Sequence, residues 1–153
     1  MIEQELARNL REFIKDAVKD LRLPVEFEKK ARAPKIINGY LPPKRSEKGD
    51  DFPFVLVRPD AATSERDATE VTVSIIIGCY AKPEEYDGYE YCMNVMTRIR
   101  NALMSMENGI LAKKYVLNFP INWNIVPEQP WPQWQLDMET KWCFNAPQAI
   151  SVF

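Results

Sequence analysis

Apolar residues recur at intervals of three and four along residues 2–21, which is the period of one face of an α-helix. Charged residues of both signs fill the positions between them, as on a solvated helix surface. Pro24 follows and is expected to end this helix. A second stripe of helical period covers residues 89–106 and precedes Asn108-Gly109, a pair typical of a helix end. The pattern therefore predicts two amphipathic helices, and each of them needs a partner surface for its apolar face.

Strand patterns occupy most of the remaining chain. The predicted strands are residues 25–28, 36–40, 52–59, 70–80, 114–118, 121–126 and 134–144. We expect the basic cluster Lys29 to Lys35, which joins the first two strands, to form a hairpin tip or a sheet edge, and residues 60–68 to form a polar turn region. The chain is thus predicted to be a single domain, residues 1–153, of the α+β class. It should contain one mixed, mostly antiparallel sheet with two main helices packed on a face.

A polar segment rich in helix and strand breakers, residues 43–51, shows no periodicity and is predicted to be a flexible loop. Long loops in compact domains are either functional or inert, and the sequence leaves both possibilities open. The candidate interface residues in this loop are Lys44, Arg45 and Lys48.

A second candidate surface is the block Glu128-Gln129-Pro130-Trp131-Pro132-Gln133-Trp134, which leads directly into the last predicted strand. Its two prolines fix φ and remove two backbone donors, so they are expected to lie outside the middle of a sheet. Rigid aromatic residues beside them are typical of a docking edge. The candidate interface residues here are Glu128, Gln129, Trp131 and Trp134. Packing of Trp131 within its own domain remains the alternative, and Trp134, Trp142 and Trp123 are predicted to be core or sheet-edge residues.

Composition narrows the possible chemistry. The chain has 153 residues, a net charge of −2, a pI near 5.3 and no histidine, so the usual general base and the usual transition-metal ligand are both missing. The three cysteines are widely spaced in apolar patterns and are predicted to be buried, reduced thiols. No glycine-rich phosphate loop is present. We therefore predict no cofactor and no metal site.

Interaction with membranes or nucleic acid is also not indicated. No purely apolar run, including Ile75-Ile76-Ile77, approaches the ~20 residues that a bilayer requires, and we expect no membrane contact. The acidic start of the chain does not resemble a secretory signal. The tryptophans gather in the last third of the chain, but no basic residue lies between Lys114 and Lys141 to accompany stacking on single-stranded nucleic acid.

One enzymatic alternative has a specific pattern. Pro59-Asp60 together with Glu139-Thr140-Lys141 is similar to the acidic and lysine residues of PD-(D/E)xK nucleases. Two carboxylates would hold a magnesium ion, and the lysine would steady the attacking water. An alternating charged strand face gives the same spacing by cross-strand pairing, so both interpretations stay open. We call Asp60, Glu139 and Lys141 the acidic–lysine trio.

Three segments together resemble a known family, the small tail terminator or tail completion proteins of long-tailed bacteriophages and prophages. They are the strand in residues 52–59, the strand in residues 75–80 leading into the helix of residues 89–103, and the Glu128 to Trp134 block with the strand that ends near Ala146-Pro147-Gln148. The resemblance covers roughly residues 51–148 and includes no catalytic signature.

The resemblance implies a structural virion protein without enzymatic activity. Such a protein would form a hexameric ring that caps the head-proximal end of the tail tube and joins it to the head connector, or stopper. Its partners would be further copies of itself, the tail tube protein and the connector protein, while DNA would pass through the ring lumen without sequence-specific binding. It would be located in the virion tail or neck, and in the bacterial cytoplasm during assembly. Another neck or head–tail joining protein, a generic bacterial interaction module and the nuclease are the alternatives.

Overall fold

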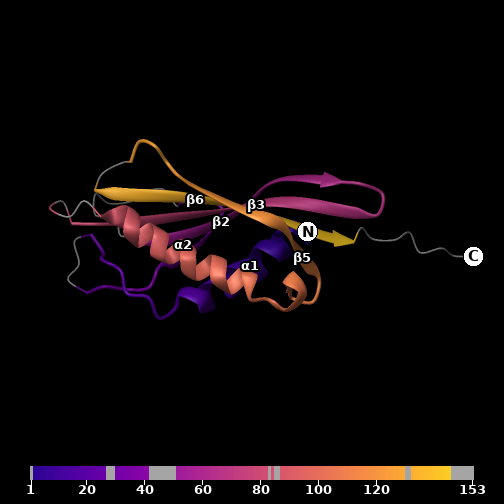
Figure 1. The fold of residues 1–153 in the computed structure, drawn as a ribbon, viewed down its shortest axis with the longest axis horizontal. Helices are drawn as coiled ribbons and strands as arrows, with labels where there is room; N and C mark the ends of the chain where they lie inside the picture. Colours follow the sequence, from indigo (N-terminus) through magenta and orange to yellow (C-terminus); the bar gives the residue numbers. More distant parts are fainter. Residues whose placement is uncertain are drawn as a thin grey trace, which may run out of the picture.

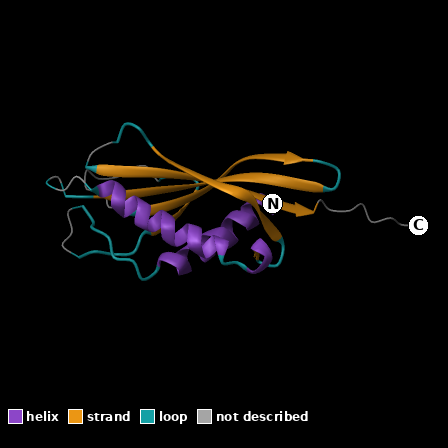
Figure 2. Cartoon of the chain, in the orientation of Figure 1, coloured by secondary structure: helices purple, strands orange, loops and turns teal. Residues whose placement is uncertain are grey.

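The computed structural model describes residues 2–26, 30–41, 51–82, 84, 87–129 and 132–145. Within these residues a mixed six-stranded sheet carries two α-helices on one face (Figures 1 and 2), which confirms the predicted α+β class. The elements in chain order are α1 (Ile2–Val18), β1 (Lys35–Asn38), β2 (Phe54–Ser64), β3 (Ala68–Tyr80), α2 (Gly88–Met104), the 3-10 turn η1 (Glu107–Gly109), β4 (Ile110–Leu111), β5 (Tyr115–Ile125) and β6 (Gln133–Asn145).

The strands lie in the order β1-β2-β3-β6-β5-β4. β1 runs parallel to β2, and every other neighbouring pair is antiparallel. The long strands β3 and β6 occupy the centre and pair over their full lengths, from Ala68 opposite Asn145 to Tyr80 opposite Gln133. The centre of the sheet is therefore built from two segments that lie far apart in the sequence.

The core lies between the sheet and the two helices. Both helices point their apolar face, whose residues recur every three or four positions, toward the sheet. They pack on the face of β3 and β6 that is formed by every second residue of these strands. The main contributors are Leu6, Leu10, Ile14 and Val18 of α1, Cys92, Met96, Ile99 and Leu103 of α2, Val71, Val73, Ile75 and Ile77 of β3, and Leu136, Met138 and Trp142 of β6. Glu3 and Glu5 in the first turn of α1 suit the positive end of the helix dipole.

A short chain of hydrogen bonds crosses this core. Trp142, which is fully buried, donates from its indole Nε1 to Thr140 Oγ1 over 2.8 Å. The Thr140 hydroxyl in turn donates to the backbone oxygen of Val73 over 3.0 Å. The polar atom of the largest buried side chain is therefore satisfied by Thr140 of its own strand, and Thr140 in turn bonds to the neighbouring strand β3, as buried polar groups require.

The hairpin predicted from residues 25–28 and 36–40 is wrong. β1 instead pairs in parallel with β2, and among the described residues the segment before it forms one isolated antiparallel bridge, between its own residues Leu23 and Arg32. Arg32 explains the difference, because its guanidinium donates to the backbone oxygens of Phe52 and Pro53 at 3.1 Å each. These bonds draw the segment toward the start of β2. Residues 27–29, which include Lys29 of the basic cluster, lie outside the described residues.

Residues 60–68 are not a polar turn region, which corrects a second prediction. β2 continues to Ser64 and β3 starts at Ala68, so only residues 65–67 connect the two strands. The ladder to β3 supplies backbone partners that outweigh the low strand propensity of these polar residues, with a register shift between Pro59 and Ala61. We call the distal part of this hairpin, residues 60–72, the arm. In Figure 1 it extends beyond both helices.

Smaller differences concern the ends of elements. α1 ends at Val18 instead of Leu21, and α2 ends at Met104 instead of Met106. The two strands predicted at residues 114–118 and 121–126 are one strand, β5, which keeps pairing with β6 across a register shift between Asn118 and Asn122.

The three cysteines are free thiols, as predicted. Cys79 and Cys92 are buried as predicted, whereas Cys143 is only partly buried, which corrects the prediction for this residue. The side-chain hydrogen bond with Cys92, together with burial, raises the pKa of the Cys79 thiol well above its ordinary value.

Candidate protein-interaction site

In the described part of the chain, the outer edge of β5 is left without a strand partner over most of its length. β4 pairs only with Tyr115 and Val116, the first two residues of β5. Among the described residues, the rest of β5 has β6 as its strand partner on one side and no strand partner on the other. Unpaired N–H and C=O groups of this kind are a template for pairing with another chain.

Large apolar side chains gather along this edge. The exposed fraction is 61% for Phe119 and 39% each for Trp123, Val116 and Ile110. We call these four residues of β4 and β5 the apolar edge. No charged residue occurs anywhere from Tyr115 to Pro127. Exposed edge strands are usually protected by charged side chains, so an apolar edge without them is typical of a surface that is covered by a partner.

A bulge explains why Phe119 faces solvent. Asn118 lies opposite Lys141 and Asn122 lies opposite Glu139, so three residues of β5 are accommodated opposite the single residue Thr140. Such an insertion bends the strand locally and redirects its side chains. Pro120, at the centre of the bulge, has no N–H for a ladder and fits an edge position.

Trp123 is exposed for a different reason. It lies directly opposite Met138, and Ile125 lies opposite Leu136, so these side chains share the helix-covered face of the sheet. Because α2 packs against β3 and β6, the indole of Trp123 on the neighbouring edge strand is left partly uncovered. A half-exposed tryptophan beside an open strand edge is a typical anchor for a protein partner.

Of the residues predicted in the block before the last strand, Gln129 organises the connection between β5 and β6. Its Nε2 donates to the backbone oxygens of Val126 and Gln135, the latter over 3.1 Å, and its Oε1 accepts from the Gln135 backbone N–H over 2.6 Å. Glu128 is exposed. Trp131 lies outside the described residues. The amide of Gln129 thus holds the turn that positions the end of the apolar edge.

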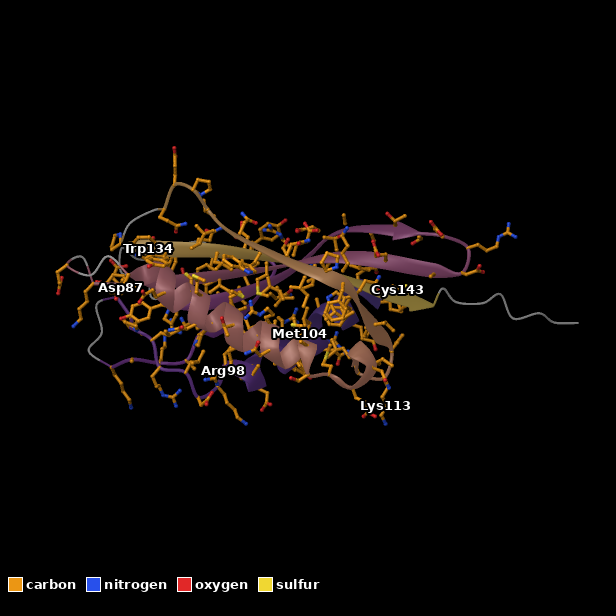
Figure 3. All side chains as sticks on the ribbon, viewed as in Figure 1. Asp87, Arg98, Met104, Lys113, Trp134 and Cys143 are labelled. Atoms are coloured by element: carbon orange, nitrogen blue, oxygen red, sulfur yellow. The ribbon has the colours of Figure 1, made fainter. Side chains whose placement is uncertain are left out.

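Trp134 packs inside its own domain, against the start of α2. A Cβ atom built on Gly88 would come within 2.0 Å of the indole Cδ1, so the ring lies directly on this glycine. The Tyr89 ring lies 6.3 Å away between centroids. Figure 3 shows Trp134 and Asp87 at the same end of the molecule. Trp134 is partly buried, which agrees with its assignment as a core or sheet-edge residue.

The predicted loop residues Lys44, Arg45 and Lys48 lie outside the described residues. Of the basic cluster before β1, Lys30 and Lys35 are exposed, while Arg32 donates to three backbone oxygens, those of Phe52, Pro53 and Ala33. Arg32 therefore has an internal structural role.

The acidic–lysine trio does share one face of the sheet, the face opposite the helices. Glu139 lies opposite Ser74, whose hydroxyl donates to the Asp60 carboxylate. Arg58 Nε also donates to that carboxylate over 2.8 Å, and this bond raises the pKa of the arginine. The Asp60 carboxylate is thus engaged by a cation and a hydroxyl. In the part of the chain that the structure describes, no group of three or more metal-ligating side chains is present.

Sequence reasoning missed the apolar edge, although a signal was present. The lack of basic residues between Lys114 and Lys141 was interpreted only as evidence against nucleic-acid stacking. Residues 115–127 also lack acidic residues, and a strand without charges of either sign is an unprotected edge. The period-two pattern of β5 is broken by the bulge at Phe119 and Pro120, and this break concealed the continuous strand.

The chain is thus an α+β domain whose edge strand β5 is open and uncharged. Comparison with protein-family models and with curated protein sequences gives no match for the chain. Among the described residues, no helix is both long and apolar enough to span a lipid bilayer.

Proposed function

We propose that this protein is a structural virion protein of a long-tailed phage or prophage, without enzymatic activity. It caps the head-proximal end of the tail tube and joins the tube to the head connector, as a hexameric ring of identical subunits. The observation that carries the proposal is the apolar edge. A repeated subunit that assembles by protein contacts needs an unprotected surface of this kind.

The resemblance to tail terminator proteins supports the proposal independently of the edge. In this role the protein contacts further copies of itself, the tail tube protein and the connector protein, and DNA passes through the lumen without sequence-specific recognition. It is located in the virion, and in the bacterial cytoplasm during assembly. A different neck or head–tail joining protein would use the same edge, so the partner must be identified by binding to tail tubes and to connectors separately.

The test replaces Phe119 and Trp123 by lysine, which places charge on the apolar edge while leaving the described core unchanged. The matched control is Leu41→Lys, because Leu41 is also 39% exposed but follows β1 at the opposite side of the sheet. Native mass spectrometry over a concentration series, with and without purified uncapped tail tubes, measures assembly. Circular dichroism verifies that each variant is folded.

We expect the wild type and the Leu41→Lys control to form rings, at least on tube ends, and the edge variant to remain monomeric and unbound. A wild-type protein that is strictly monomeric and ignores tail tubes would end the proposal. So would an edge variant that assembles like the wild type. Metal-dependent DNA cleavage that is lost on Glu139→Gln or Lys141→Ala would favour the nuclease instead.

A further inference from the structure

A cationic pocket of about 580 Å³ lies between α1 and the adjoining parts of β1 and β2. Its volume is in the range of sites that accept a small ligand or a short piece of chain. The residues that give it its chemistry are Glu3, Arg8, Arg11, Asn38, Tyr40 and Arg58. We call it the arginine pocket.

Most of the positive charge in this pocket is not neutralised. Arg8 is exposed and makes no hydrogen bond or ion pair with another described residue. Arg11 donates from Nη1 to the neutral amide oxygen of Asn38 over 2.9 Å. Arg58 uses Nε for Asp60, and its two terminal nitrogens have no partner among the described residues. The pocket therefore retains guanidinium donors for an incoming carboxylate.

Two of these guanidinium groups are already held in place. The bond from Arg11 to Asn38 fixes one of them, and Arg58 is fixed both by Asp60 and by the Tyr40 ring, whose centroid lies 4.7 Å from its Cζ. Tyr40 itself is 72% exposed. Arginine and tyrosine that are immobilised before binding lose little entropy on association, and both residue types are enriched where binding energy concentrates.

A complementary element is present at the tip of the arm. The turn is closed by the Glu65 N–H, which donates to the Ala68 oxygen over 2.8 Å. All residues from Ala61 to Asp67 are exposed, and neither Glu65 nor Asp67 forms an ion pair within the described part of the chain. Arg66 lies between them, and Glu3 in the pocket offers a carboxylate to it. The narrow tip thus offers two carboxylates to the guanidinium groups of the pocket and one guanidinium group to Glu3.

A chain cannot place this tip in its own pocket. Pro59 lines the pocket and lies on the same extended strand as the residues that lead to Glu65. With a rise of about 3.3 Å per residue, the separation along β2 is roughly 20 Å. A contact between tip and pocket must therefore join two molecules, and because it joins different surfaces it is head-to-tail. Contacts of this type generate rings when the rotation closes.

We propose that the acidic tip of the arm, residues 65–67, binds in the arginine pocket of a second copy of this chain. Because this contact would link subunits within the ring, the inference rests on the proposed function. It is a charged contact between partly exposed groups, so it sets the geometry and the rate of association and weakens with salt.

The experiment reverses the charges and then mixes the variants. The tip variant is Glu65→Lys/Asp67→Lys, and the pocket variant is Arg8→Glu/Arg58→Glu. Each variant alone presents like charges at the contact, so we expect its self-association constant to fall at least about tenfold. In a mixture, the tip of each variant meets a pocket of opposite charge. Sedimentation velocity at 50 mM salt should then show restored, mixed oligomers.

Controls separate this contact from general effects of charge and folding. Lys15→Glu changes an exposed charge on α1 outside the pocket, and Glu107→Lys changes an exposed charge outside the tip, so both should associate like the wild type. Thermal unfolding verifies the fold of each variant. If replacing Arg58 unfolds the protein, Arg8→Glu alone replaces the double variant, since Arg8 makes no described hydrogen bond or ion pair.

Three results would overturn the inference. The first is a wild type that stays monomeric at millimolar concentration and low salt. The second is a folded tip variant that assembles normally, and the third is a mixture of folded variants in which no oligomers return. Loss of tail-tube binding in the pocket variant without any effect on self-association would assign the pocket to another protein. Tube capping that needs Phe119 and Trp123 but tolerates the charge reversals would preserve the proposed function and remove only this contact.

Discussion

The hydroxyl of Thr140 can be removed with almost no change of side-chain volume by the substitution Thr140→Val. The hydroxyl accepts from the indole of Trp142 over 2.8 Å and donates to the backbone oxygen of Val73 over 3.0 Å, and Thr140 and Trp142 are both fully buried. After the substitution the buried indole N–H has no acceptor. The packing remains, so the change isolates the polar contribution.

The expected loss of stability follows from these two bonds. A buried donor left without a partner costs about 1–3 kcal/mol, and the lost bond to the carbonyl adds about 0.5–1.5 kcal/mol. We therefore expect the free energy of unfolding of Thr140→Val to fall by about 1.5–4.5 kcal/mol. For a chain of this length each kcal/mol lowers the melting temperature by roughly 2–4 °C.

Urea unfolding at constant pH, monitored by tryptophan fluorescence, measures this change, and an unaltered m value confirms that the same two states are compared. The control is Thr72→Val, because Thr72 lies on the opposite face of the sheet and should change the unfolding free energy by less than about 0.5 kcal/mol. In the double variant Thr140→Val/Trp142→Phe the donor is also absent, so the two losses should be less than additive. A Thr140→Val protein as stable as the control would refute the reasoning.

Three further predictions concern other parts of the molecule. Gly88→Ala should lower stability by about 1–3 kcal/mol, measured by thermal unfolding, because the new Cβ meets the indole of Trp134 at 2.0 Å; an unchanged melting temperature would mean that the ring moves freely. In native protein at pH 8, Cys143 should react with a thiol reagent at least about tenfold faster than Cys79 and Cys92, since burial and a raised pKa keep Cys79 protonated, and equal rates would contradict this assignment. Millimolar magnesium or manganese should leave the melting temperature unchanged, whereas a rise that depends on the acidic–lysine trio would reveal a metal site.

The helices and strands were predictable wherever burial of one face makes apolar residues recur at regular intervals along the sequence. The stripes of α1 and α2 and the alternation in β3 and β6 identified both helices and the two central strands, because these segments bury one face and expose the other. The strand order was not accessible in the same way. The pairing of β1 depends on the bonds from Arg32 to the start of β2, which join residues about twenty positions apart, and no local pattern encodes them.

The candidate interface was predictable only in part. The Glu128 to Trp134 block was recognised as unusual, but its unusual residues include Gln129, which holds a turn, and Trp134, which covers the start of α2. Aromatic residues near proline look alike whether they pack inward or outward. The exposure of Phe119 arises from a bulge, and that of Trp123 from the limited reach of α2, so both depend on tertiary structure.

The strand order also has a consequence for synthesis of the chain on the ribosome. The hairpin of β2 and β3 can form early, but the second edge of β3 stays open until residues 133–145 arrive to complete the centre of the sheet. During that interval a long apolar strand is available to any neighbouring nascent chain. The yield of native protein therefore depends on how long this edge stays open during translation as well as on the stability of the finished fold.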